Sequence, residues 1–394
     1  MIEKLRKSSL YPVLLKSWLA FHKAVIRLFW QLCYPLPVQK QKIIFSNFNG
    51  GGFGDNPKYV AEACIRRGLP YKLYWVCTNP KAGGPYPAEL TLIRPNTLSF
   101  VYHMATARFW VDNTRKLYYF KKKKNQIYIH TAHGGPGMKR IERDAQEGLT
   151  PEYVAYAKRD SAHMDLLLSN CRFFTQCLRS SYWYDGPILE KGIPKNDLYF
   201  RNVPEQRKLI RDYYGLPEDA RLVLYVPTWR EDRKLNVYHL DFEGCLNAFE
   251  ERFGGSWYML MRMHPNVNAD DFDIRYTDRV LNASPYPNVQ ELLAGGDAVI
   301  TDYSSCGFDY IQLDRPSFIY AEDYEQMKHD RGFYLELDEI PVPAAFSNEE
   351  MIQNVREFSW EEYERRRAPF MERMDYYDDG HASDAVVDYI LEHT

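Results

Sequence analysis

The sequence predicts an α/β protein with two Rossmann-like domains facing a cleft and an amphipathic helix ahead of them. Its 394 residues exceed what one ordinary hydrophobic core serves, so two domains of about 150 to 200 residues each are expected. Short apolar runs alternate with helical stretches in two successive blocks, which is typical of parallel sheets. Because a polar stretch at 199–207 separates the blocks, we expect segments 1–40, 41–203 and 204–394.

The amino-terminal segment is basic and amphipathic, and Glu3 is its only acidic residue. Apolar residues recur every three or four positions, which predicts a helix that lies in the headgroup plane of an anionic cytoplasmic leaflet. Lysines and arginines interrupt each apolar run short of the roughly 20 residues that span a bilayer, so neither a transmembrane helix nor a signal peptide is expected. Packing of the helix on its own domain is the alternative. The expected membrane residues are Lys16, Trp18, Phe21, Lys23, Arg27 and Phe29.

The apolar runs are the predicted strands. They read "KIIFSN", "YKLYWVC", "RFWVDN", "QIYIHTA" and "DLLLSN" in the first block, and "RLVLYVPT", "WYMLMRMH", "DAVITDYSS" and "PSFIY" in the second. The helix-like "PKYVAEACIRRG" between the first two runs gives the strand–helix–strand order of a parallel sheet. Residues 359–393 predict two charged helices joined near Gly380.

Charge, cysteine content and motif spacing argue against several classes of protein. The net charge of −3 gives no general reason to bind nucleic acid, so a site for an anionic ligand must be local. The seven cysteines are scattered and odd in number, as in a reduced cytosolic protein. His130 and His133 have an odd separation on a predicted strand and so point to opposite faces, which argues against a zinc site. The glycine-rich "NGGGFGDNP" lacks the spacing of a dinucleotide fingerprint.

Five polar segments follow predicted strands or lie between them, where doubly wound sheets bind ligands. They are "TAHGGPGMKR" with His133, Gly134, Gly135 and Lys139; "KGIPKND" with Lys195 and Asn196; "VPTWRED" with Thr228 and Arg230; "MRMHP" with Arg262 and His264; and "ITDYSSCGFDY" with Asp302, Ser304, Ser305 and Asp309.

Together these residue types indicate a diphosphate site. Serine hydroxyls and free amides at a helix start can hold phosphate oxygens, and arginines from neighbouring strand ends can clamp the same group. An imidazole titrates close to neutral pH and can act as a general base or stabilise charge. For each segment alone a structural role is the alternative, since a strand-end histidine is commonly hydrogen-bonded and a serine pair at a helix start is commonly an N-cap.

In this order, the segments resemble the signature blocks of the CDP-glycerol glycerophosphotransferase family of teichoic acid primases and polymerases, over roughly residues 42–390. The resemblance implies a GT-B-type fold and a peripheral enzyme on the cytoplasmic face of the cell membrane. It also implies transfer of glycerol phosphate from CDP-glycerol to a polyprenyl-diphosphate-linked saccharide, with release of CMP. No cofactor is certain, and a divalent cation and an oligomeric state stay open.

The resemblance also implies roles for the residues. His133 would be the base, His264 and Arg230 would stabilise the diphosphate and departing CMP, and Ser304 and Ser305 would hold phosphate oxygens. Asp302 or Asp309 would orient neighbouring groups. The remaining donor-site residues would be Arg262, Lys195, Asn196 and Thr228, and the acceptor loop would contain Gly134, Gly135 and Lys139.

Three departures from the family pattern leave the substrates open. Ala132 stands where tryptophan is common, "GPGM" replaces the usual residues after the histidine, and Lys195 stands where arginine is usual. Lacking a large extra domain, the chain looks more like a primase than a polymerase, and CDP-ribitol is an alternative donor. The rivals are a nucleotide-sugar glycosyltransferase of the same fold and a catalytically silent membrane scaffold.

Overall fold

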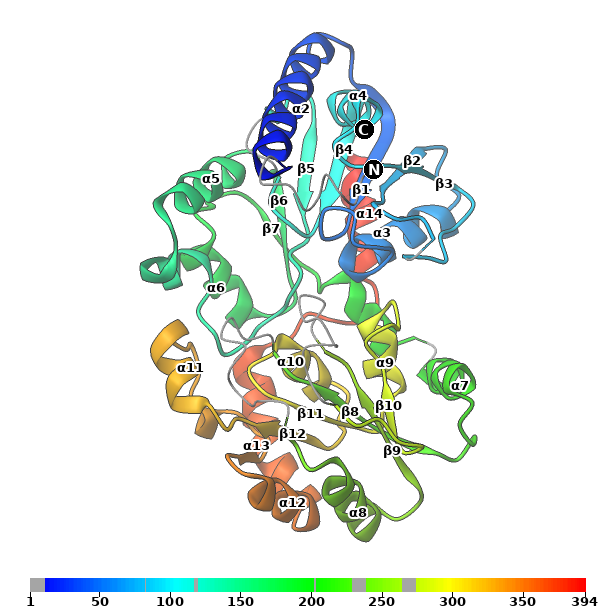
Figure 1. The fold of residues 1–394 in the computed structure, drawn as a ribbon, viewed down its shortest axis with the longest axis vertical. Coiled ribbons are helices and arrows are strands. Elements are labelled where there is room, and N and C mark those ends of the chain that lie inside the picture. The colour runs from blue at the N-terminus through cyan, green and yellow to red at the C-terminus, as the bar shows by residue number, and fades with distance from the viewer. Residues whose placement is uncertain (1–10, 82, 117–119, 202, 229–238, 264–273) are drawn as a thin grey trace.

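The computed structural model of the protein describes residues 11–81, 83–116, 120–201, 203–228, 239–263 and 274–394. They form two lobes, each with a parallel sheet and helices packed around it (Figure 1). This agrees with the predicted pair of α/β domains.

The first lobe contains, among the described residues, a seven-stranded sheet in the order β3-β2-β1-β4-β5-β6-β7. Its strands are β1 (Gln39–Ser46), β2 (Lys72–Val76), β3 (Leu90–Ile93), β4 (Ala107–Asp112), β5 (Ile127–His130), β6 (Leu166–Ser169) and β7 (Ile188–Glu190). The intervening helices are α3 (Asp55–Arg66), α4 (Leu98–Thr106), α5 (Pro151–Ser161) and α6 (Arg172–Ser181), with 3-10 turns η1 (Glu142–Gly148) and η2 (Pro194–Tyr199).

The second lobe repeats this pattern, with six strands among the described residues in the order β10-β9-β8-β11-β12-β13. Its strands are β8 (Arg221–Val226), β9 (Trp257–Met261), β10 (Val280–Asn282), β11 (Ala298–Thr301), β12 (Ser317–Tyr320) and β13 (Ala344–Ala345). The helices are α7 (Val203–Tyr214), α8 (Phe242–Phe253), α9 (Val289–Gly295), α10 (Ser305–Ile311), α11 (Tyr324–Arg331), α12 (Asn348–Arg356) and α13 (Trp360–Met374), with 3-10 turn η4 (Leu337–Glu339).

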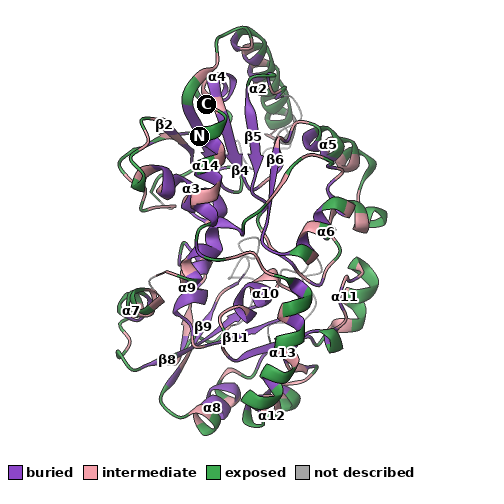
Figure 2. Cartoon of the chain, turned by 180° about the vertical axis from the view of Figure 1, so that it is seen from behind, coloured by how far each residue is buried: buried purple, intermediate pink, exposed green. Residues whose placement is uncertain are grey.

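Burial explains why continuous apolar runs became central strands. Every residue of β5, β6, β11 and β12 is buried, and Figure 2 shows buried strands inside a more exposed shell of helices. Strands covered on both faces need apolar residues at every position rather than at alternate positions. The sequence therefore carries a clear signal for them.

The carboxyl-terminal helix α14 (Ala382–Glu392) differs from the predicted domain boundary at 204–394. It crosses back to the first lobe, where it lies beside α3 (Figure 1). Its apolar positions Val386, Val387 and Ile390 are fully buried in the core formed by β1 and its neighbours. The three positions share one helical face, and this face is buried in the core of the first sheet.

The amino-terminal helix α2 (Tyr11–Cys33) has two unlike parts. In its second half Ile26, Trp30 and Cys33 are buried, and the Trp30 ring packs against Phe120 with centroids 4.9 Å apart. Phe29, an expected membrane residue, is half-buried against the same core. In the first half, every side chain from residue 14 to residue 21 is exposed. Over the residues described, no helix combines the length and apolar character needed to cross a membrane.

Candidate functional site at the meeting of two sheet ends

Each sheet reverses its strand order at one point, between β1 and β4 in the first lobe and between β8 and β11 in the second. Doubly wound sheets bind ligands beyond the carboxyl ends of the strands at such switch points. In the first lobe these ends lead into Phe48 and Asn113, whose amide and side-chain oxygen are 2.9 Å apart. In the second lobe they lead into Thr228 and Asp302. Two candidate ligand sites are therefore built by equivalent parts of the two lobes.

The loop that contains His133 belongs to the first lobe and packs against the second lobe. A Cβ added to Gly134 would lie 3.2 Å from Ser305 Oγ, and one added to Gly135 would lie 3.1 Å from Asp309 Oδ1. Further along, Tyr334 N donates to Met138 O at 2.7 Å. The glycines expected in this loop thus allow a close approach to the turn that begins α10, which a side chain would hinder.

The His133 elbow is held by backbone contacts. Ala132 has φ +54°, a left-handed conformation that turns the chain sharply between β5 and His133. Asn56 Nδ2 donates to both Thr131 O and Ala132 O at 3.1 Å, and His130 Nδ1 accepts from Ala132 N at 3.2 Å. Burial lowers the pKa of His130 well below its usual value, so this imidazole is neutral and can accept that hydrogen bond.

His133 itself is exposed. Its Nδ1 lies 3.4 Å from Asn113 O, and its ring centroid lies 5.6 Å from that of Phe48. A backbone carbonyl next to Nδ1 favours a proton on that nitrogen, which leaves Nε2 as the basic atom. The geometry therefore suits a general base at the first switch point.

Asn56 ties the elbow to the segment "KGIPKND". Its Oδ1 accepts from Lys195 N at 3.0 Å while its amide nitrogen holds the carbonyls before His133. The preceding residue, Asp55, has φ +54°. Burial raises the pKa of the Asp55 carboxyl, and the positive charge of Lys195 acts in the opposite direction. Asp55 and Asn56 belong to the glycine-rich segment that the sequence analysis set aside, so both were missed.

Lys195 and Asp309 form a buried ion pair between the lobes, with Nζ and Oδ2 2.5 Å apart and side chains 5% and 0% exposed. Burial alone would lower the pKa of Lys195, but the carboxylates of Asp309 and Asp55 raise it, so the amine stays charged. Asn196 Nδ2 lies 3.3 Å from the other Asp309 oxygen. The pair joins Lys195, which was predicted to belong to the donor site, to Asp309, which was predicted to orient neighbouring groups, and each charge is neutralised inside the protein.

Further buried polar residues complete this junction. Asp378 accepts from Asn196 Nδ2 at 2.9 Å and from Asn170 Nδ2 at 3.0 Å, and burial raises its pKa to about 6. Gln290 Nε2 donates to Asn196 Oδ1 at 3.0 Å. The sequence analysis did not single out these three partners, because a lone Asp, Asn or Gln carries no spacing signal.

In the second lobe, the predicted residues have mainly structural partners. Asp302 accepts from Thr228 N at 2.9 Å and from its hydroxyl at 2.5 Å. Ser304 is the N-cap of α10, where its Oγ accepts from Cys306 N at 3.3 Å. Arg262 donates to Ala283 O at 3.0 Å and to Tyr286 O at 2.5 Å. Asp302, Thr228 and Ser304 thus shape the turns at the second switch point, and Arg262 holds the loop that follows β10.

Of the remaining predicted residues, two lie between the lobes and two lie outside the described part of the chain. Ser305 is half-buried and faces the His133 loop across the lobes. Lys139 pairs through its backbone with Phe333, which adds a second link between the lobes. Arg230 and His264 lie outside the described residues. In the described part of the chain, no group of three or more His, Cys, Asp or Glu residues is arranged to hold a metal ion.

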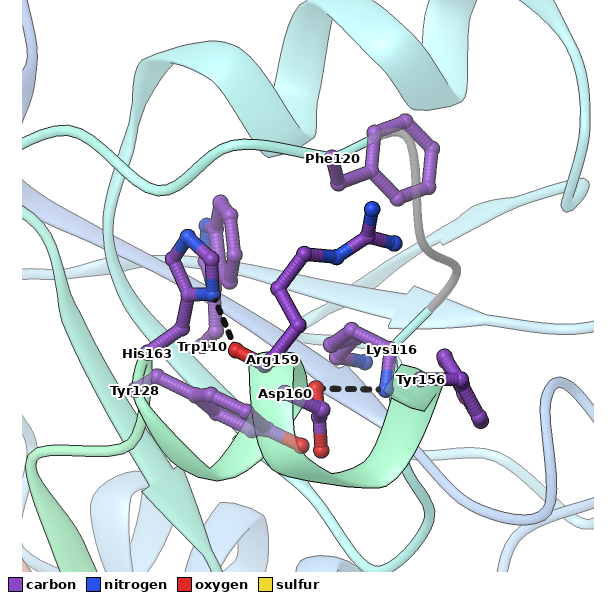
Figure 3. Close-up of a pocket in the computed structure, with 8 residues that line it drawn as sticks. All are labelled: Trp110, Lys116, Phe120, Tyr128, Tyr156, Arg159, Asp160 and His163. Carbon is purple, nitrogen blue, oxygen red and sulfur yellow. Dashed lines mark hydrogen bonds between the residues drawn. The ribbon is translucent and has the colours of Figure 1, made fainter. Parts of the chain in front are cut away.

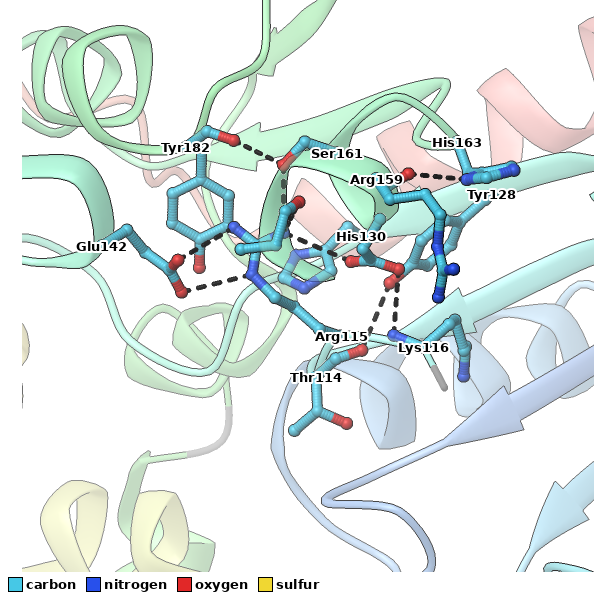
Figure 4. A network of polar contacts seen from close by, with 12 residues as sticks. Thr114, Arg115, Lys116, Tyr128, His130, Glu142, Arg159, Ser161, His163 and Tyr182 are labelled. Carbon is cyan, nitrogen blue, oxygen red and sulfur yellow. Dashed lines mark hydrogen bonds and ion pairs between the residues drawn. The ribbon is translucent and has the colours of Figure 1, made fainter. Parts of the chain in front are cut away.

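A buried network of polar contacts around Arg115 holds the chain segment that follows β4 at the first switch point. Figure 4 shows the guanidinium of Arg115 between Glu142, at 3.1 Å, and Ser161, at 3.0 Å. Arg115 also pairs with Asp160 at 3.3 Å. Because Arg115 follows Asn113 by two residues, these contacts anchor the segment that holds both His133 and Phe48.

A small pocket adjoins this network on the side of α5. Figure 3 shows its lining, with Lys116 N donating to Asp160 Oδ1 at 3.0 Å. Burial lowers the pKa of the Lys116 amine to about 7. None of the residues predicted for catalysis or donor binding lines the pocket, whose residues are Trp110, Lys116, Phe120, Tyr128, Tyr156, Arg159, Asp160 and His163.

The protein is therefore a two-lobed α/β protein with two doubly wound parallel sheets. The histidine loop of the first lobe lies against the switch-point turn of the second. The chain belongs to the CDP-glycerol:poly(glycerophosphate) glycerophosphotransferase family, whose match covers residues 28–392. This confirms the family resemblance found in the sequence.

Individual relatives agree with this assignment. The chain is 32% identical over 368 residues to the teichoic acid poly(glycerol phosphate) polymerase of Staphylococcus epidermidis, covering 90% of this chain and 51% of that protein. It thus spans about half the length of that relative. It is 27% identical to the teichoic acid glycerol-phosphate transferase of Staphylococcus aureus, covering 92% of this chain and 96% of that protein. A structure of the wall teichoic acid polymerase TagF, a histidine-to-asparagine variant with CDPG, matches with TM-score 0.83 and 30% identity, covering 93% and 92% of the two chains.

Proposed function

We propose that the protein is a GT-B-type glycerophosphotransferase that transfers glycerol phosphate from CDP-glycerol to a polyprenyl-diphosphate-linked saccharide and releases CMP. The observation that carries the proposal is the contact of the His133 loop with the Ser305 turn, where the carboxyl ends of both sheets meet. Membership of the family supports the donor and the transferred group.

In the proposed reaction, His133 Nε2 removes the proton from an acceptor hydroxyl at the first switch point. The acceptor oxygen then forms a bond to the phosphorus that carries glycerol, and the bond from this phosphorus to the bridging oxygen breaks. CMP leaves with the bridging oxygen and its electron pair. Such a displacement depends on positioning and on neutralising charge rather than on covalent catalysis.

The donor diphosphate is proposed to lie at the second switch point, beside Ser304 and Ser305. Arg230 and His264 are proposed to neutralise the departing CMP. Lys195, Asn196 and Asp309 act in this scheme by holding the two lobes in register, since their polar groups are buried and paired with one another. Asp302 and Thr228 hold the turn on which the diphosphate would rest.

The test of the function is CMP release from CDP-glycerol in the presence of a synthetic polyprenyl-diphosphate disaccharide, with the product analysed by mass spectrometry. We expect a product that carries one glycerol phosphate unit, as for a primase. A ladder of products would indicate a polymerase, and transfer only from CDP-ribitol would change the donor. Release of UDP from UDP-sugars without CMP release would contradict the proposal and favour a glycosyltransferase, and no transfer from any donor would favour a scaffold.

We also propose that α2 holds the protein on the cytoplasmic face of the membrane. Trp18 and Phe21 are 58% and 69% exposed, and Leu28 and Leu32 expose a further apolar strip on the half that packs on the lobe. Lys16, Lys23 and Arg27 are exposed on the same helix. Exposed aromatic and basic residues on one helix fit the interface of an anionic bilayer.

Replacing both Trp18 and Phe21 with aspartate is expected to reduce binding to phosphatidylglycerol vesicles by at least about 10-fold. Each aromatic ring contributes about 1.5–3 kcal/mol when it leaves water, and aspartate adds repulsion from the anionic surface. Co-sedimentation with vesicles measures the effect. The matched control is Leu209→Asp on α7, a residue that is 45% exposed. Equal binding by the double variant and the control would contradict the membrane role.

A further inference from the structure

Phe48 is an exposed aromatic residue in an unfavourable backbone conformation. Its side chain is 48% exposed, and its φ is +42°. A bulky residue in the left-handed region is strained and persists only where its surroundings impose the conformation. Neither burial of the ring nor backbone preference therefore accounts for a phenylalanine here. Strained residues of this kind cluster at ligand sites.

The backbone of Phe48 is fixed from both strands of the first switch point. Its amide donates to Asn113 Oδ1 at 2.9 Å, just beyond β4. Asn113 Nδ2 in turn donates to Asn47 Oδ1 at 2.7 Å, at the end of β1. Gly50 N and Gly51 N donate to Asn47 O at 2.9 and 2.8 Å, which closes the turn after the ring. The ring is thus presented by a rigid frame.

The same frame positions the general base. Asn113 O is the group next to His133 Nδ1, at 3.4 Å, while the Asn113 side chain holds the Phe48 amide. The two rings are tilted by 59° with centroids 5.6 Å apart. A molecule resting on the exposed part of the phenyl ring would therefore lie beside the imidazole that is proposed to take the proton.

We propose that Phe48 is the stacking platform for a saccharide ring of the acceptor, placed so that the attacking hydroxyl reaches His133. This inference rests on the proposed function and deepens it. A saccharide ring has an apolar C–H face that packs on an aromatic ring, and a hydroxyl edge that stays free for hydrogen bonds and reaction. A rigid ring in a prepared conformation lowers the entropy lost on binding.

The main alternative occupant of the ring is the nucleobase of the donor, which also has a flat face. The position of Phe48 favours the acceptor, because the ring belongs to the first switch point and adjoins the base that activates the acceptor hydroxyl. The second switch point, with Ser304 and Ser305, offers the donor a separate site. Substrate-specific kinetics separate the two occupants.

The test uses the Phe48→Asn variant, since asparagine tolerates the left-handed region and removes only the ring. Steady-state kinetics with CDP-glycerol and a synthetic polyprenyl-diphosphate disaccharide are expected to show an acceptor KM raised by about 10-fold, in line with one lost stacking contact. The donor KM is expected to stay within about 2-fold of the wild-type value. Phe48→Tyr, which restores a ring, is expected to recover most of the acceptor affinity.

The control is Phe346→Asn, which removes a phenyl ring that is 47% exposed on the second lobe. Thermal unfolding of all variants shows whether they fold. A rise in donor KM alone would assign the ring to the nucleobase, and a loss confined to kcat with an altered pH profile would make it a support for His133; either result overturns the platform.

Calorimetric titration with the same disaccharide separates this inference from the proposed function, because it requires no turnover. If the wild-type protein releases no CMP, the proposed function fails. Weaker disaccharide binding by Phe48→Asn than by wild type would still support the platform, and equal binding, or no binding by either protein, would overturn it.

Discussion

Replacing His133 with alanine is expected to lower the turnover of CDP-glycerol and acceptor by about 100-fold or more, the usual contribution of a general base. The imidazole is exposed at the first switch point, and Asn113 O lies beside Nδ1, so Nε2 is the atom available to accept a proton. Steady-state CMP release at saturating substrates measures the loss. Binding of CDP should change little, since the ring is not proposed to contact the donor.

The control for this substitution is His329→Ala, because His329 has a side chain 87% exposed on α11. Because His133 is open to solvent, added imidazole is expected to restore part of the activity of His133→Ala in proportion to its concentration. Near-normal turnover of the His133 variant would remove the base from the proposed mechanism.

Replacing Lys195 with methionine is expected to lower the free energy of unfolding by about 3–5 kcal/mol. The substitution leaves the carboxylate of Asp309, which is fully buried, without its opposite charge. Because the pair joins the two lobes, the loss is expected in the main unfolding transition. The midpoint and slope of urea denaturation, followed by circular dichroism, measure it.

Two further variants test whether the effect comes from the stranded charge. Lys208→Met removes an exposed ion pair with Asp212, whose side chains are 71% and 62% exposed, and should leave the midpoint of urea denaturation nearly unchanged, because solvent screens such pairs. The double variant Lys195→Met with Asp309→Leu removes both buried charges and is expected to be more stable than Lys195→Met alone. If the double variant is no more stable than Lys195→Met alone, the loss of stability does not come from the unpaired charge of Asp309.

Much of the fold could be predicted from local sequence signals. The runs that became β1, β4, β5, β8 and β11 are apolar at successive positions and end at polar or turn residues, which identifies strands buried on both faces. The order of these runs also predicted two parallel sheets. The placement of α14 could not be predicted, because its apolar face is compatible with either sheet and only the packed molecule shows which one it covers.

The candidate site was only partly predictable. His133, Gly134 and Ser305 stand out because glycines, a histidine and serines follow apolar runs, and the structure brings these residues together. Asn56 was missed because its role is to hold the backbone of other segments, at Thr131, Ala132 and Lys195. A residue that bonds to backbone atoms far along the chain leaves no pattern in its own neighbourhood.

The sequence by itself determined which segments form strands, that there are two parallel sheets, and which polar loops follow their ends. These properties depend on hydrophobic burial and turn chemistry over a few neighbouring residues. Only the tertiary structure decided that Lys195 neutralises Asp309, 114 residues away, and that Asn113 fixes both Phe48 and His133. The physical reason is that the charge state, the partner and the exposure of a polar side chain depend on which distant segment folds against it.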